Sequence, residues 1–124
     1  MEARARWQGV KSMSCRAQVT RGTTPSLEFE VMDADLTGWS VYLTMRTAGM
    51  DEPLTKVTGQ LVIEYDAEAG TTTVTAPLSQ EDTLALSVGT CEAQIRAIKD
   101  GDAIATDVVQ FSVSRILLDG EIDA

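Results

Sequence analysis

The feature that most constrains this chain is the alternation of apolar and polar residues with a period of two. In residues 26–31 and 39–46, every second side chain is apolar and those between are mostly polar. Because successive side chains of a β-strand point to opposite faces, each segment would have one apolar and one polar face. The same pattern recurs in residues 61–65, 72–76, 91–97 and 109–113. Segments of this kind indicate an all-β chain in which one sheet packs against another.

Turn-forming residues lie between these segments. The sequence DAEAG at residues 66–70 carries Asp and Gly, which tolerate the left-handed backbone of a tight loop, so it predicts a hairpin. Asp100 and Gly101 predict a second hairpin. That hairpin would join residues 91–98 to residues 103–113 as the longest two-stranded ribbon of the molecule.

These strands and turns predict an immunoglobulin-like antiparallel β-sandwich of seven or eight strands. One short helical turn is expected near residues 79–86, because Ser79 can cap its first turn and two acidic residues follow near its positive end. A length of 124 residues suits one domain. We place this domain at residues 15–124, after a basic N-terminal arm at residues 1–14.

The charge of the chain is divided unevenly. Residues 1–16 carry four basic residues and one acidic residue, giving +3, and the remaining 6 basic and 18 acidic residues give −12. Such an acidic body would repel a phosphate backbone, so nucleic acid is not an expected partner. Instead, the arm is predicted to dock onto an acidic neighbouring protein, the alternative being a terminus that contacts nothing. The arm residues expected at that interface are Arg4, Arg6, Trp7 and Lys11.

The cysteines and the apolar runs bear on the compartment. Cys15 and Cys91 are 76 positions apart and lack the spacing of a zinc site. We expect two buried, reduced thiols, because no export signal places the chain in an oxidising compartment, and the sequence leaves a disulfide between them open. The chain shows neither a secretion signal nor an apolar run of about 20 residues, so we expect neither export by the general route nor a membrane partner.

The sequence DADLTG at residues 33–38 raises the question of a metal site. A helix-flanked calcium loop needs an Asp or Asn ligand at its fifth position and a glutamate at its twelfth. Thr37 and Thr44 occupy these positions, and the flanking residues have strand-like patterns. We therefore expect a polar turn in which the aspartates bond nearby backbone N–H groups and Leu36 enters the core. Neither a metal nor another cofactor is expected.

The residue types that catalysis needs are sparse. The chain has no histidine, which is the commonest general base and a common metal ligand. Its acidic clusters lie at predicted hairpin turns, and its serines lack the context of a nucleophile elbow. We therefore expect no enzymatic activity and no small-molecule substrate.

Aromatic residues bear on an alternative function, the recognition of a carbohydrate or a cell surface. Sugar-binding modules usually stack flat sugar faces on two or three exposed rings. Four rings are predicted to face the core: Phe29, Trp39, Tyr65 and Phe111. Tyr42 and Trp7 remain as candidate exposed rings. Carbohydrate or cell-surface recognition through the loops is therefore retained as the alternative.

Four sequence segments follow one another between residues 21 and 122. RGTTPSLEFEV is a short turn with an alternating strand, and DADLTGWSVYLTMR is an acidic turn with a strand ending in Arg. EYDAEAGTTTVTAPLSQEDTLAL is a hairpin followed by a helical turn, and CEAQIRAIKDGDAIATDVVQFSV is a final ribbon. This order resembles the immunoglobulin-like domain at the N-terminus of phage baseplate upper proteins and related prophage tail proteins.

The resemblance implies a non-enzymatic structural module of a phage tail or baseplate that docks onto copies of itself or onto other tail proteins. It also implies a virion component that is assembled in the cytoplasm of the bacterial host. Outside the arm, we expect the interface to include one exposed ring and the apolar residues of the C-terminal tail, which must pack on this body or on a neighbour. These residues are Tyr42, Ile116, Leu117 and Leu118.

Overall fold

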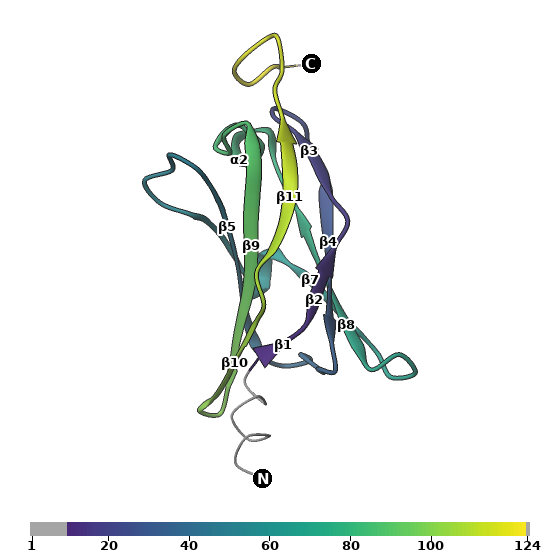
Figure 1. The fold of residues 1–124 in the computed structure, drawn as a ribbon. Coiled ribbons are helices and arrows are strands. Elements are labelled where there is room, and N and C mark those ends of the chain that lie inside the picture. Colours follow the sequence, from purple (N-terminus) through teal and green to yellow (C-terminus); the bar gives the residue numbers. More distant parts are fainter. Residues whose placement is uncertain (1–9, 124) are drawn as a thin grey trace.

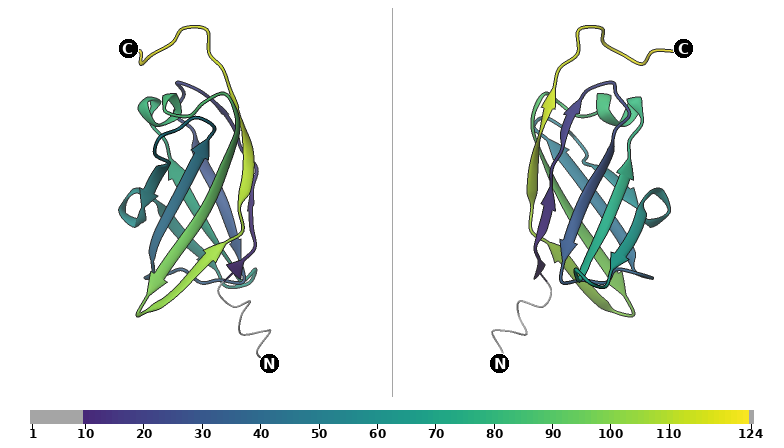
Figure 2. Two further views of the ribbon diagram at one scale, coloured as in Figure 1. Left: turned by 60° about the vertical axis from the view of Figure 1, so that its left-hand side comes forward. Right: turned by 90° about the vertical axis from the view of Figure 1, so that its right-hand side faces the viewer.

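The computed structural model describes residues 10–123, which form two β-sheets packed face to face (Figures 1 and 2). One sheet contains β1 (Val10–Lys11), β3 (Gln18–Thr20), β5 (Ser40–Thr47), β6 (Leu54–Val57), β9 (Gly89–Lys99), β10 (Asp102–Thr106) and β11 (Val109–Ser114). The other contains β2 (Met13–Cys15), β4 (Ser26–Met32), β7 (Val62–Asp66) and β8 (Thr71–Pro77). The two short helices are η1 (Thr58–Gln60) and α2 (Gln80–Leu84).

The eleven strand segments form eight continuous runs, which confirms the expected immunoglobulin-like sandwich. β10 and β11 are successive pieces of one C-terminal run, and both pair antiparallel with β9. β1, β2 and β3 are pieces of one N-terminal run that changes sheets twice. β1 and β3 pair in parallel with β10 and β11, whereas β2 pairs antiparallel with β4 in the opposite sheet. This run therefore closes one side of the sandwich.

The domain boundary predicted at residue 14 is wrong, because residues 10–14 belong to the sheets. Val10 pairs with Ala105, and the side chain of Met13 is buried in the core. The backbone N–H of Met13 also donates a hydrogen bond of 2.9 Å to the Asp107 carboxylate. The strand pieces here are only two and three residues long. Pieces that short cannot show a clear alternation of apolar and polar residues. The prediction therefore followed the basic charge of the segment and assigned it to the arm.

The apolar face of each alternating segment lies in the core between the sheets, as expected. Among the described residues, the apolar ones with no more than 2% exposure are Val19, Phe29, Val31, Leu36, Val41, Leu43, Met45, Val74, Ala76, Leu86, Cys91, Ala93, Ile95 and Ala97. Phe111 is also buried, and Trp39 packs half-buried against the core. Tyr65 does not follow the prediction, since it is 40% exposed. It lies on β7, the outer strand of its sheet, where a neighbouring strand covers its flank on one side alone.

Both predicted hairpins are present. Asp66 pairs with Thr71, and the N–H of Gly70 donates to the Asp66 carbonyl at 2.8 Å, which closes the turn between β7 and β8. Asp100 and Gly101 form a two-residue loop between β9 and β10, with φ values of 50° and 86°. Both values lie in the left-handed region that Asp and Gly tolerate. β9 is the longest of the described strands, and it pairs at four positions with β10 and at five with β11.

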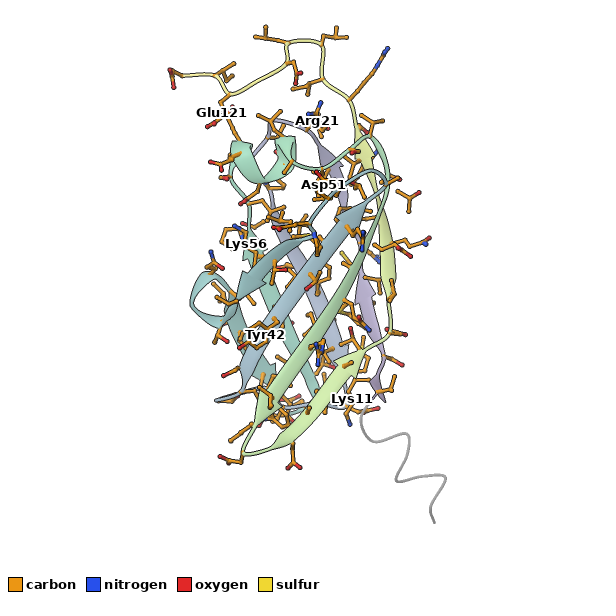
Figure 3. All side chains as sticks on the ribbon, turned by 90° about the vertical axis from the view of Figure 1, so that its left-hand side faces the viewer. Lys11, Arg21, Tyr42, Asp51, Lys56 and Glu121 are labelled. Carbon is orange, nitrogen blue, oxygen red and sulfur yellow. The ribbon has the colours of Figure 1, made fainter. Side chains whose placement is uncertain are left out.

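The expected helical turn is α2, and its capping agrees with the sequence. The Asp82 N–H donates to Ser79 Oγ at 3.1 Å, and the Ser79 N–H donates back to the Asp82 carboxylate at 2.9 Å. This capping box satisfies two backbone donors at the helix start. Lys56 Nζ of β6 also lies 2.9 Å from Asp82 Oδ2, and both side chains are at most 14% exposed. The ion pair therefore ties a strand of one sheet to the helix. Lys56 is labelled in Figure 3.

Candidate binding surfaces

The acidic turn at residues 33–38 is a structural element. The Thr37 N–H donates to the Asp35 carboxylate at 3.0 Å, and hydrogen bonds from Thr37 hold the pKa of Asp35 below its ordinary value. Thr72, which is fully buried on β8, holds the turn from beneath. Its hydroxyl donates to the Ala34 carbonyl at 2.6 Å and accepts from the Leu36 N–H at 3.1 Å. Leu36 is buried, as predicted, so the turn anchors the chain before β5.

Metal-binding and nucleophilic chemistry find little support among residues 10–123. Within that range, no group of three or more His, Cys, Asp or Glu residues is placed to hold a metal ion. Cys15 and Cys91 are free thiols, the first half-buried and the second fully buried. Burial raises the pKa of each thiol to about 11. Because the thiolate is the reactive form, neither cysteine is activated as a nucleophile near neutral pH.

An open, acidic hollow of about 860 Å³ lies on the outer face of the four-stranded sheet. Glu30 of β4 and Glu64 of β7 lie on either side of Thr73 in one cross-strand row. The other charged residues that line the hollow are Arg16, Glu28 and Asp66. These side chains lie on an exposed sheet surface and are spread over separate strands. The arrangement therefore offers no enclosed pair of carboxyl groups for acid–base catalysis.

The structure separates the residues that we predicted for one interface. Arg4, Arg6 and Trp7 lie outside the described residues. Lys11 is half-buried in β1, in a hollow that it shares with Asp33, Asp35 and Asp102 of its own chain. It is thus part of the domain and not of an extended arm.

The remaining predicted interface residues lie at two distant places. Tyr42 is 43% exposed on the outer face of the seven-stranded sheet. Leu117 and Leu118 are 93% and 71% exposed beyond the end of β11. Ile116 is half-buried beside Gly22, with its Cδ1 atom close to where a Cβ atom of residue 22 would lie. Tyr42 and the two leucines are thus available to a partner, whereas Ile116 packs partly on its own domain.

Around Tyr42, apolar side chains gather on the outer face of the seven-stranded sheet. Tyr42 is paired with Val57 on one side and with Arg96 on the other. This row continues through Ala105 of β10 to Val10 of β1. The next row contains Ser40, Ile98 and Ala103. Val10, Val57 and Ile98 are each at least 40% exposed, so the patch crosses five strands.

The middle of this patch is a groove of about 370 Å³, which we call the β9 groove. Its lining residues are Tyr42, Thr44, Thr55, Arg96, Ala97, Ile98, Ala103 and Ile104. Arg96 is the one charged residue among them. Figure 3 shows this face of the sheet, with Tyr42 in its lower half. The groove is thus mainly apolar, with a single positive charge.

The sequence prediction identified Tyr42 but missed the other residues of the β9 groove. Ile98 was detectable, because it follows Ala97 and breaks the alternation by placing an apolar residue in the polar phase of β9. Ala103 and Ile104 become part of the groove through the pairing of β10 with β9. Pairing partners are set by the fold, so no local pattern could have joined these residues to Tyr42.

At the opposite end of the sandwich, residues 115–123 form what we call the tail loop (Figure 1). The Gln80 side chain of α2 makes two hydrogen bonds of 3.0 Å with the backbone of Ile122, one to its N–H and one to its carbonyl. Arg21 Nη1 lies 3.5 Å from Asp119 Oδ1. Arg21 itself donates to the carbonyls of Leu84 and Leu86, each at 2.9 Å. These contacts hold the tail loop against the helical end of the domain.

Comparison with known proteins leaves the fold and these surfaces as the basis for assigning a function. No protein-family model matches the chain, and no curated protein is significantly similar to it. The described helices are also too short or too polar to span a lipid bilayer.

Proposed function

We propose that this chain is a non-enzymatic assembly module of a phage tail or baseplate, binding copies of itself or other tail proteins. On this proposal it is a virion component that is assembled in the cytoplasm of the bacterial host. The observation that carries the assembly role is the apolar patch around the β9 groove. Contiguous exposed apolar patches with polar rims mark interaction sites on soluble proteins. The order of the sequence segments, which resembles that of phage tail domains, supports the phage context.

The position of the exposed rings favours assembly over the alternative of carbohydrate recognition. Tyr42 lies on β5 of the seven-stranded sheet, whereas Tyr65 lies on β7 of the four-stranded sheet. Two rings on different sheets cannot form one platform for a flat sugar face. Aliphatic side chains such as Ile98 and Val57 surround Tyr42, and they suit a protein partner.

Arg96 adds a specific requirement for that partner. Its charge lies in the middle of the apolar patch, paired across strands with Tyr42 and Ala105. A partner that covers the patch would have to supply an acidic group, because an uncompensated buried charge is costly. We therefore expect a partner surface that combines apolar side chains with carboxylates.

The test is the solution mass of the intact chain by light scattering after size exclusion, compared with that of Ile98→Ser. The matched control is Val88→Ser, because Val88 is 56% exposed in the loop before β9 whereas Ile98 is 45% exposed. We expect a concentration-dependent oligomer that Ile98→Ser weakens about tenfold, as expected for loss of one buried aliphatic side chain. Equal masses for all three proteins, at the mass of one chain, would contradict assembly through copies of itself.

A further inference from the structure

The β9 groove and the tail loop are both exposed, and they lie toward opposite ends of the sandwich. In Figure 3, Tyr42 is in the lower half of the sheet and Glu121 is above its upper end. Gln80 and Arg21 hold the tail loop at its own end of the domain. A chain in this conformation does not place its tail loop in its own groove.

We propose that the tail loop of one copy docks in the β9 groove of a second copy. Leu117 and Leu118 of the first copy would contact Tyr42 and Ile98 of the second. This inference rests on the proposed assembly function and names the contact through which copies associate. Because the contact joins two different surfaces, it repeats from copy to copy and gives a ring or a filament.

The exposure of the two leucines matches the character of the groove. Leu117 is 93% exposed and Leu118 is 71% exposed, and adjacent leucines this exposed are costly to leave in water. The groove is flanked on the outer face of the sheet by the exposed side chains of Tyr42 and Ile98, whereas the side chain of Ala97, another lining residue, faces the core. Its volume of about 370 Å³ suits a few side chains instead of a whole helix or strand. A protruding pair of leucines fits that size.

The charges of the two surfaces are complementary. The tail loop carries three acidic residues and one basic residue, namely Asp119, Glu121, Asp123 and Arg115. The β9 groove carries the opposite charge, through Arg96. The tail loop thus supplies the combination of apolar and acidic groups that Arg96 requires. The net charge of −9 makes two copies repel each other when their acidic surfaces meet. This repulsion disfavours orientations that do not bring the acidic tail loop to Arg96.

The contacts of the tail loop also prepare it for docking. Two hydrogen bonds between Gln80 and Ile122, one donated by each residue, and the ion pair of Arg21 with Asp119 hold the loop before a partner arrives. A loop that is already ordered loses less conformational entropy on binding. The contact is nevertheless small, below the roughly 1,200 Å² of stable complexes, so we expect a dissociation constant on the order of 100 µM for one contact.

The test is a complementation experiment with two variants that retain residues 1–124. The tail variant is L117S/L118S, and the groove variant is Y42S/I98S. All four side chains are at least 43% exposed in the isolated chain, so both variants should keep the fold, which circular dichroism checks. Solution mass is measured for each variant and for their equimolar mixture at about 10 µM to about 1 mM.

Each variant alone should be mainly monomeric up to about 100 µM, because its association is weakened at least tenfold. The mixture should give a dimer and nothing larger, because it contains one intact tail loop and one intact groove for each pair. The control variant V62S/V88S, whose side chains are 52% and 56% exposed, should assemble like the unmodified chain. If two grooves, or two tail loops, contacted each other symmetrically, mixing the two variants would not restore a dimer between them.

The outcomes separate this inference from the proposed function. Assembly of the unmodified chain that persists in the tail variant would overturn the docking of the tail loop and leave assembly through the groove intact. A mixture that stays monomeric while the unmodified chain assembles would overturn it as well. A monomeric unmodified chain over the whole concentration range would overturn both this inference and assembly through copies of the chain.

Discussion

Thr72 offers the sharpest test of the conclusion that the acidic turn at residues 33–38 is structural. Its hydroxyl is fully buried and joins the Ala34 carbonyl to the Leu36 N–H. Thr72→Val has nearly the same shape but removes the hydroxyl. The change therefore leaves one buried acceptor and one buried donor without the partner that they have in the folded chain.

The expected loss follows from those two hydrogen bonds. Each unsatisfied buried group costs about 1–3 kcal/mol, and the added methyl group of valine returns up to about 0.8 kcal/mol. We therefore expect Thr72→Val to lower the free energy of unfolding by about 1–5 kcal/mol. For a domain of this size, a loss near the middle of that range lowers the melting temperature by roughly 10 °C.

The assay is urea denaturation followed by circular dichroism, with two matched controls. Thr72→Ser keeps the hydroxyl and loses one methyl group, so it should cost about 1 kcal/mol. Thr73→Val changes the next residue, which is half-buried on the outer side of β8, and should change the free energy by less than about 0.5 kcal/mol. If Thr72→Val unfolded at the same urea concentration as the unmodified chain, the hydroxyl would not be holding the turn.

Three further predictions concern stability. Burial alone would raise the pKa of Asp82, but hydrogen bonds from Ser79 and the charge of Lys56 outweigh it and hold that pKa below its usual value. Asp82→Asn should therefore destabilise the chain at pH 7, and the difference in stability from the unmodified chain should disappear as the pH falls below about 4. Urea denaturation of both proteins at pH 7 and below about pH 4 checks this. Removing residues 1–14 should give a melting temperature about 10 °C or more below that of a chain lacking residues 1–9, because buried Met13 and its strand pairs are lost. Added Ca²⁺ should leave the melting temperature unchanged, and a rise with Ca²⁺ would contradict the structural interpretation of the acidic turn.

The sequence predicted the layers of the fold well, because burial on one face imposes a period of two. Leu43 and Ile95, for example, both lie in the core where the alternation placed them. The prediction from the sequence failed where the alternation of apolar and polar residues is too short or is interrupted. Val10 pairs with Ala105, almost a whole chain length away, and Met13 belongs to a three-residue strand piece that pairs with Val31 of β4.

The binding surfaces were predictable in part. Exposed Leu117 and Leu118 were found as apolar residues beyond the last strand, and Tyr42 as an aromatic ring in the polar phase of its strand. The β9 groove as a whole was not found, because it forms where β5, β9 and β10 come together across the sheet. Cross-strand register determines such a surface, and no local pattern contains it.

The central claim is that copies of this chain associate through the β9 groove, and the most direct measurement is an NMR titration with protein concentration. Backbone amide signals are followed from about 10 µM to about 1 mM, which spans the expected dissociation constant. Docking of the tail loop in the β9 groove should give concentration-dependent shifts at Tyr42, Arg96 and Ile98, and at Leu117 and Leu118, with little change on the four-stranded sheet. Shifts confined to the four-stranded sheet, or no shifts at all, would contradict it.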